Sequence, residues 1–162
     1  MLHEVTGDIL PTGARMLAHG VAPNDDFHSG LALALREHWP ALYKDSRHWC
    51  KQTSPQPGGL WVWAAPSGLR IANLLTQEPG DHRGAHPGRA RLEHVNHALR
   101  ALHAFVEQEG IESLALPRLA CGVGGLEWAQ VRPLLAQHLG NGPARVYIYG
   151  TYRKGERAFE PA

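Results

Sequence analysis

Apolar residues recur along this chain with two different spacings, and the two spacings alternate. Between residues 92 and 106 leucine and valine fall every three or four positions, which predicts a helix over 91–109 that ends at Gly110. Residues 60–65 and 70–76 are rich in strand-forming side chains and flank a Pro-Ser-Gly turn, which predicts a hairpin. Alternating strands and helices are typical of an α/β layered domain with a mostly parallel sheet.

The remaining segments fit the same plan. We predict further strands at 2–5, 15–19, 114–116 and 146–149, and further helices at 29–38 and 127–139. Two stretches, 51–59 and 78–88, are dense in proline, glycine and polar residues and are predicted to be loops. Trp61 and Trp63 share one face of a strand, so we expect both indoles to pack against a helix layer.

The length and charge of the chain exclude several classes of protein. Its 162 residues predict a single domain at 1–152, followed by a C-terminal tail at 153–162 that we expect to be frayed. A net charge of +1 gives no general attraction for nucleic acid, and no segment is apolar enough for a membrane helix or a secretory signal. We therefore expect a cytoplasmic protein that acts as a monomer and has no membrane partner.

Histidine and cysteine do not form a metal-binding pattern. The 11 histidines are spread along the chain: two share the predicted loop at 78–88, and His94 and His97 lie on one predicted helix without a recognisable third ligand. Cys50 and Cys121 are far apart and lack the CxxC spacing. We predict no metal and no cofactor.

One candidate site is the glycine-rich segment between a predicted strand and a predicted helix. Residues 116–128 read LPRLACGVGGLEW. Free backbone amides in such a loop, together with the N-terminus of the next helix, can bind a phosphate or a diphosphate. The alternative is a tight turn in which glycine only relieves the backbone. Neither GKS/GKT nor GxGxxG is present, so the segment is neither a P-loop nor a dinucleotide fingerprint.

Two other segments place polar residues directly after a predicted strand. Residues 18–30 run from a strand through a polar loop to the start of a helix, where free amides could bind a second anion. The alternative is that Asp25, Asp26 and Ser29 only cap that helix. Asp8 follows the first strand, and its carboxylate could accept from the exocyclic amine of a base or could form an Asx turn.

In their order and spacing, these segments resemble the macrodomains, which are ADP-ribose-binding αβα modules. The resemblance is strongest to the branch with the terminal ADP-ribose protein glycohydrolase and the DNA ADP-ribosyl glycohydrolase antitoxins. It is carried by Gly7-Asp8-Ile9-Leu10, Leu17-Ala18-His19, His28-Ser29-Gly30-Leu31-Ala32, Leu74-Leu75-Thr76, the segment 116–128 and Val146-Tyr147-Ile148-Tyr149. It implies a three-layer αβα fold with a central mixed, largely parallel sheet. The implied partner is ADP-ribose or an ADP-ribosylated protein, and a nucleic acid only if it is itself ADP-ribosylated.

The resemblance also assigns roles to single residues. Asp8 would read the adenine amine with backbone support from Ile9, and the loop from Asn24 to Gly30 would cover the distal ribose and part of the diphosphate. The amides of residues 122–125 would hold the diphosphate. Of the aromatic residues after the last strand, Tyr152 is the candidate to flank the adenosine, and Tyr149 fits a buried sheet position better. The ligand-binding residues expected in this way are Asp8, Ile9, His19, Asn24, Ser29, Gly30, Gln77, Cys121, Gly122, Val123, Gly124, Gly125, Leu126 and Tyr152.

Two departures from the family pattern affect the chemistry. Gln77 stands where the glycohydrolase branch has a lysine that attacks the distal ribose, and an amide cannot form a Schiff base. Gly124 stands where one relative has an assisting aspartate. A hydrolase on this scaffold would need a positioned water and a base. The catalytic candidates are Asp25, Asp26 and His28, with His19 also near in sequence.

Three functions remain open from the sequence. The first is hydrolysis of ADP-ribose from an ester-linked glutamate or aspartate, because an acyl ester is labile enough for a positioned water. The second is a non-catalytic reader of ADP-ribose, which would tolerate the loss of both catalytic groups. The third is removal of phosphate from ADP-ribose 1''-phosphate in the same pocket. The unused acid and base groups at residues 24–28 favour the hydrolase.

Overall fold

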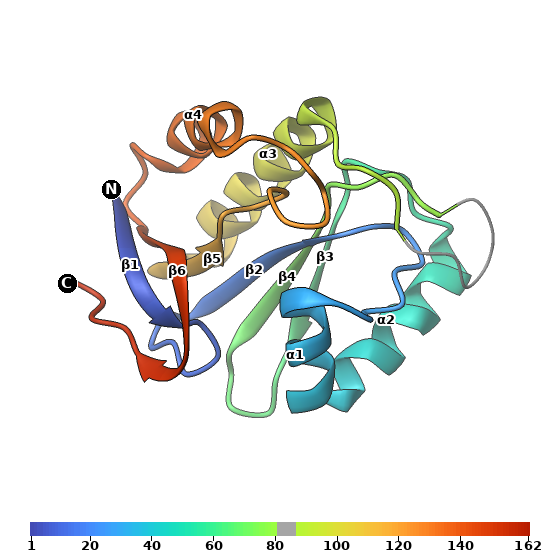
Figure 1. Ribbon diagram of the computed structural model, residues 1–162, viewed down its shortest axis with the longest axis horizontal. Coiled ribbons are helices and arrows are strands. Elements are labelled where there is room, and N and C mark those ends of the chain that lie inside the picture. The colour runs from blue at the N-terminus through green and yellow to red at the C-terminus, as the bar shows by residue number, and fades with distance from the viewer. Residues whose placement is uncertain (81–86) are drawn as a thin grey trace.

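A computed structural model describes residues 1–80 and 87–162, which form one sheet covered by helices (Figure 1). The predicted loop at 78–88 lies partly outside this range, together with its two histidines, His82 and His86. In chain order the elements are β1 (Leu2–Asp8), β2 (Met16–Val21), α1 (Gly30–His38), α2 (Pro40–Thr53), β3 (Leu60–Ala64), β4 (Arg70–Leu75), α3 (Leu92–Glu109), β5 (Ser113–Pro117), α4 (Trp128–Leu139) and β6 (Arg145–Arg157).

The sheet is mixed and largely parallel. Its strand order is β1-β6-β5-β2-β4-β3, and only the β3–β4 hairpin is antiparallel. The predicted hairpin and the predicted α/β class are therefore confirmed. Because five neighbouring strands run in one direction, their carboxyl ends meet at one edge of the sheet, where open α/β sheets bind ligands.

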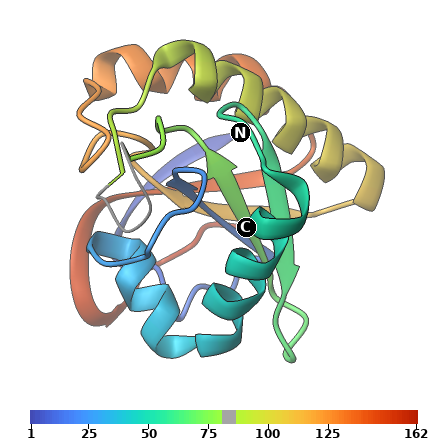
Figure 2. The ribbon, with the colours of Figure 1, turned by 90° about the vertical axis from the view of Figure 1, so that its right-hand side faces the viewer.

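The core has two halves because successive residues of a strand point to opposite faces of the sheet. In β2, Met16 and Ala18 pack with α3 and α4, whereas Leu17 packs with α1 and α2. In β6, Val146 and Tyr147 divide in the same way. Figures 1 and 2 show the helix pairs on opposite sides of the sheet, which gives the predicted three-layer αβα arrangement.

Helix α2 was not expected from the sequence, and it replaces the first part of the loop predicted at 51–59. Pro40 occupies its first position, where the missing N–H costs nothing, and Ser54 ends it with a left-handed backbone. Its buried residues are Leu42, Ser46 and Cys50, a stripe only one residue wide. Such a narrow stripe, with a serine in its middle, gives little apolar periodicity to detect.

The two tryptophans of β3 pack on this helix. Trp61 stacks on Trp49, with ring centroids 5.7 Å apart, and the Nε1–H of Trp63 donates to Asp45 at 2.8 Å. The expectation that both indoles face a helix layer is confirmed, and that layer is α2. The pair therefore covers the outer end of the sheet rather than offering a free surface.

The expectation of a frayed tail is wrong. β6 pairs with β1 up to Tyr152, Arg157 pairs with Asp8 after a break in register, and the last residues fold back onto the sheet. Glu160 accepts from the backbone N–H of Gly13 at 2.9 Å and from the hydroxyl of Tyr149 at 2.7 Å, while the hydroxyl of Tyr147 donates to the carbonyl of Pro161. Amino-acid composition could not predict these bonds. The tail residues bond either to residues about 150 positions earlier in the chain or to tyrosines of β6.

Within the described ranges, no helix combines the length and the apolar character needed to cross a bilayer.

Candidate functional site

Two adjoining cavities open at the carboxyl edge of the sheet. Their volumes are about 380 Å³ and about 510 Å³. The smaller one lies between the end of β1 and α1, and the larger one lies between α1 and the glycine-rich loop after β5. The residues common to both linings are Gly30, Leu31, Pro117, Tyr149 and Tyr152. The two spaces are therefore one composite cavity with two halves.

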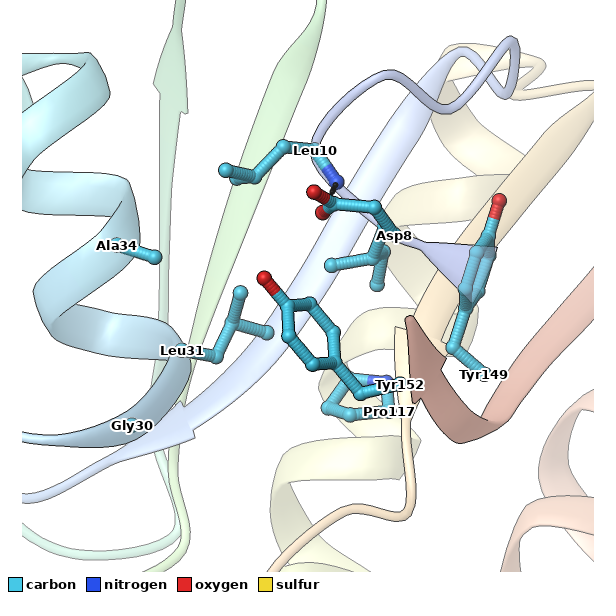
Figure 3. Close-up of a pocket in the computed structure, with 9 residues that line it drawn as sticks. Asp8, Leu10, Gly30, Leu31, Ala34, Pro117, Tyr149 and Tyr152 are labelled. Carbon is cyan, nitrogen blue, oxygen red and sulfur yellow. Dashed lines mark hydrogen bonds between the residues drawn. The ribbon is translucent and has the colours of Figure 1, made fainter. Parts of the chain in front are cut away.

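Asp8 fixes one end of the small half. Its carboxylate is buried and accepts from the backbone N–H of Leu10 at 3.0 Å (Figure 3). It also accepts from the backbone N–H of Gly155 at 3.0 Å. The Asx-turn alternative is therefore correct as a description of the local geometry. The turn leaves the carboxylate able to bind a ligand, because each carboxylate oxygen can accept a second hydrogen bond. The backbone holds an anionic acceptor beside Ile9 in the cavity wall.

Tyr152 forms the open side of the same half. The residue is 60% exposed, and in Figure 3 its ring points toward α1, where Leu31 and Ala34 point back toward it. Tyr149 lines the cavity from within the sheet and is buried. Burial raises the pKa of its hydroxyl, and the neighbouring Glu160 carboxylate acts in the same direction. An apolar slot between Tyr152 and α1 suits a flat heterocycle.

The glycine-rich loop supplies free amides to the large half. Gly122, Val123 and Gly124 line the cavity, and within the described part of the chain their backbone N–H groups donate to no acceptor. The amides of Gly125 and Leu126 are engaged instead, with the carbonyls of Gly122 and Ala120. The expectation that residues 122–125 all offer amides is therefore corrected to 122–124, because the amide of Gly125 closes the turn.

Close packing explains the glycine at position 124. A Cβ there would lie 2.6 Å from the carbonyl oxygen of Ala120 and 2.8 Å from the Cβ of Ala90. The carbonyl of Gly124 also accepts from the N–H of Ala90 at 3.0 Å. The loop is thus held against Ala90, just before α3, and any side chain at 124 would displace it. Cys121 lines the cavity beside it, with its thiol donating to the carbonyl of Leu119.

The other side of the large half is the N-terminus of α1. Ser29, Gly30, Leu31 and Ala32 line the cavity there, and the side chain of Ser29 makes no capping bond. The first-turn amides of a helix have no partner within the helix and attract anions. The two anion-binding segments predicted from the sequence therefore face one space.

Phe27 determines how the preceding loop is oriented. It is fully buried with a left-handed backbone, φ 53°, and it contacts the rings of His19 and Tyr43 at centroid distances of 5.7 Å and 5.5 Å. Its neighbours Asp26 and His28 lie outside the cavity wall, as does Asn24. The carboxylate of Asp26 instead accepts from the backbone N–H of His28 at 3.2 Å. The structure does not bring these three predicted residues to the cavity.

Asp25 is the acidic residue of this loop that lines the cavity. Its two carboxylate oxygens accept from the backbone N–H of Ala22 at 2.8 Å and of Phe27 at 2.9 Å. Burial raises the pKa of this carboxyl, the two backbone bonds work against that rise, and the charge of Asp26 adds to it. The group both holds the loop and keeps a proton-accepting oxygen beside the cavity.

His19 and Gln77 form part of the cavity floor. His19 is buried, and its Nε2 lies 2.6 Å from Oδ1 of Asn73. Burial lowers the pKa of His19 to about 4, although the bond to Asn73 acts in the opposite direction. Gln77 is also buried, and its amide donates to the carbonyl of Gly88 at 3.0 Å. Both predicted residues therefore lie at the site as uncharged groups at neutral pH.

Three residues at the site were not selected from the sequence. Phe27 anchors the loop, Asn73 holds His19, and Arg118 lines the large half with its guanidinium 5.6 Å above the Trp128 ring. Among the described residues, no carboxylate forms an ion pair with Arg118. Its cationic charge beside the free amides makes the large half suitable for an anion. Arg118 belongs to the motif at 116–128, but residue type alone does not determine the direction of its side chain.

Among residues 1–80 and 87–162, no three histidine, cysteine or carboxylate side chains lie close enough together to bind a metal ion.

Comparison with known proteins identifies the scaffold. The family model of the Macro domain matches residues 25–135, which is more than half of the chain. The chain belongs to the macrodomain family. The match includes the Asn24-to-Gly30 loop from Asp25 onward and the whole glycine-rich loop, so both candidate anion-binding segments of this macrodomain fall inside it.

Individual relatives agree with this assignment. A DNA ADP-ribosyl glycohydrolase of Thermus aquaticus is 27% identical over 139 residues, which cover 86% of this chain but only 38% of that protein. The macrodomain of Thermus aquaticus DarG has a TM-score of 0.79 and 25% identity, over 93% of this chain and 98% of that one. Thermosipho africanus DarTG, solved in complex with ADP-ribose, has a TM-score of 0.72 and 24% identity, over 89% of this chain and 39% of that one.

Proposed function

We propose that this macrodomain binds ADP-ribose in the composite cavity. The observation that carries the proposal is the order of groups along one cavity. A buried carboxylate, Asp8, lies at the end of the small half, and three free amides of the glycine-rich loop face the start of α1 in the large half. Adenine offers an amine to the carboxylate, and the diphosphate offers anionic oxygens to the amides.

The relatives support this ligand. DarTG of Thermosipho africanus was solved with ADP-ribose, and the Thermus aquaticus relative is named a DNA ADP-ribosyl glycohydrolase. This chain spans less than half the length of both proteins, so their whole activity does not carry over. Two observations together support ADP-ribose as the ligand of this chain. The chain belongs to the macrodomain family, and the cavity wall carries groups that suit ADP-ribose.

We further propose that the protein releases ADP-ribose from a carboxylate ester on a glutamate or aspartate side chain. A water attacks C1'' of the distal ribose, the bond from C1'' to the ester oxygen breaks, and the carboxylate leaves with the bonding electrons. The proton of the water passes to Asp25 and then to solvent. Asp25 fits this role because burial raises the pKa of its carboxyl, which makes it a stronger base than an exposed aspartate.

The reader function is the second candidate, and two observations favour it. The buried Gln77 occupies the position of the family lysine, and its side-chain amide donates to the carbonyl of Gly88. Both oxygens of Asp25 already accept backbone bonds. A protein that only binds ADP-ribose needs neither a nucleophile nor a base at these positions.

Calorimetry and a release assay together test these proposals. Titration with ADP-ribose should show saturable binding to a monomer. The monomer should then release ADP-ribose from a glutamate-ADP-ribosylated peptide. Asp25→Asn should reduce release by a larger factor than it weakens ADP-ribose binding, which it also affects because its amide replaces one of the two oxygens that hold the loop. The protein would be a non-catalytic reader if it binds ADP-ribose but releases none from the peptide or from ADP-ribosylated DNA, and no phosphate from ADP-ribose 1''-phosphate. The absence of ADP-ribose binding would overturn the proposal.

A further inference from the structure

One buried polar atom in the cavity floor has no partner. Nδ1 of His19 is shielded from solvent and makes no hydrogen bond within the described residues. His19 is one of the residues that line the large half of the cavity. Buried polar atoms in native proteins are nearly always paired, and leaving one unpaired costs stability. An unpaired nitrogen in a cavity wall therefore points to a group that arrives with a ligand.

The neighbours of His19 determine what that nitrogen can do. The amide nitrogen of Asn73 donates to the carbonyls of Trp61 at 3.1 Å and Ile71 at 3.3 Å, so Oδ1 of Asn73 faces His19 as an acceptor. Nε2 of His19 must then carry the proton and donate to it. In neutral imidazole the other nitrogen bears a lone pair. Nδ1 is therefore an acceptor, held in position by the two bonds of Asn73.

The chemistry of ADP-ribose leaves one kind of donor for this acceptor. The adenine amine belongs to the small half, whose lining contains Asp8 and not His19. The diphosphate oxygens at neutral pH only accept hydrogen bonds, and they have the free amides of residues 122–124 for that purpose. The donors that remain on the ligand are ribose hydroxyl groups. Those of the adenosine ribose adjoin the adenine in the small half, and those of the distal ribose lie beyond the diphosphate in the large half.

We propose that Nδ1 of His19 accepts a hydrogen bond from a hydroxyl of the distal ribose, and that this bond lets the cavity distinguish ADP-ribose from nucleotides that end at the diphosphate. This inference rests on the proposed ADP-ribose binding and assigns the specificity of the same site. His19 is in this account a binding residue, and Asn73 is the residue that positions it.

Substitution by phenylalanine tests the bond because it keeps a ring and removes both nitrogens. His19→Phe should weaken ADP-ribose binding by about 3- to 10-fold, the usual worth of one neutral hydrogen bond. Its affinity for ADP, which lacks the distal ribose, should stay as in the wild type. The matched control is His138→Phe: His138 also pairs with an asparagine, with Nε2 2.7 Å from Oδ1 of Asn96, but it lies on α4 outside the cavity lining.

A second measurement uses the unmodified protein, in case His19→Phe does not fold. Nitrogen-15 NMR of labelled histidine should show His19 protonated at Nε2 only, and its Nδ1 resonance should move on saturation with ADP-ribose but not with ADP. An unmoved Nδ1 resonance, or equal losses for both nucleotides in His19→Phe, would overturn this inference while ADP-ribose binding stands. If the wild-type protein binds ADP-ribose no better than it binds ADP, the inference is also wrong. Failure to bind either nucleotide would instead remove the proposed function itself.

Discussion

Asp8 and His19 are both buried at the cavity, but only in Asp8 does every polar side-chain atom have a hydrogen bond within the fold. Both oxygens of Asp8 accept backbone N–H groups, which fix the direction of the carboxylate. His19 has one nitrogen bonded to Asn73 and the other unpaired. At the residue scale the small half therefore offers a negative acceptor and the large half a neutral one, and the two can be tested separately.

Asp8→Asn tests the negative acceptor. The amide keeps the size of the side chain but replaces one acceptor oxygen by a donor that faces backbone N–H groups. ADP-ribose affinity should fall by about 10-fold or more, since hydrogen bonds that involve a charged group are worth about twice neutral ones. Calorimetry measures the change. Asp45→Asn, on α2 beside Trp63, should leave the affinity unchanged; an equal effect of both substitutions would refute the role of Asp8.

Burial of His19 predicts a pH dependence of folding stability. The pKa is about 6.5 in the unfolded chain and about 4 in the folded protein, so between these values the unfolded state binds the proton and the folded state does not. The free energy of unfolding should fall as the pH is lowered through this window, by on the order of 3 kcal/mol in total. The raised pKa of Asp25 acts in the opposite direction.

Urea unfolding at pH 7 and pH 4.5 measures this contribution. The wild-type protein should lose more stability between the two pH values than His19→Phe, because the substitution removes this titration and leaves Asp25 and the other groups in place. Equal losses in the two proteins would show that His19 does not stay neutral on folding.

At the element scale, the regular elements could be predicted where one face is broad and apolar. α3 has five buried residues and ends at Gly110, so its spacing and its end were both visible in the sequence. α2 was missed because its buried stripe is narrow. The glycine-rich loop lines the cavity, but which of its amides stay free depends on bonds within the turn. Residue types do not determine those bonds, and for that reason Gly125 was assigned to the wrong role.

The packing of the glycine-rich loop against Ala90, just before α3, leads to a prediction at position 124. Gly124→Ala would place a Cβ too close to backbone Ala120 and to Ala90, so the loop must shift. We expect a loss of stability of about 1–3 kcal/mol, as for other overpacked sites, and a loss of ADP-ribose binding. A Cβ at Gly122 meets nothing within 4 Å, so Gly122→Ala should keep the melting temperature of the wild type. Equal melting temperatures for the two variants would contradict this account.

The tail after β6 is a structural element, and Glu160 holds it. Its carboxylate accepts from Thr12, Gly13 and Tyr149, so Glu160→Ala should lower the free energy of unfolding by about 1–2 kcal/mol. Limited proteolysis should then cut the tail faster. Glu156→Ala removes only an exposed ion pair with Arg153 at 3.9 Å and should change neither quantity. Unchanged proteolysis of Glu160→Ala would mean that the tail is held by other contacts.

At the scale of the whole molecule, the parallel sheet assembles the site. The cavity wall combines segments from the start of the chain, such as Asp8, with segments near its end, such as Tyr152. Their proximity could be predicted, because the carboxyl ends of neighbouring parallel strands meet at one edge. The direction of each side chain could not. It was the burial of Phe27 that brought Asp25 to the cavity and left Asp26 and His28 outside it.

A crystal structure of this macrodomain soaked with ADP-ribose tests the central claim most directly. The account predicts adenine in the small half with its amine on Asp8, the diphosphate between the amides of residues 122–124 and the start of α1, and the distal ribose beside His19. ADP-ribose bound at another surface, or bound here in the reverse direction with its adenine beside His19, would contradict it.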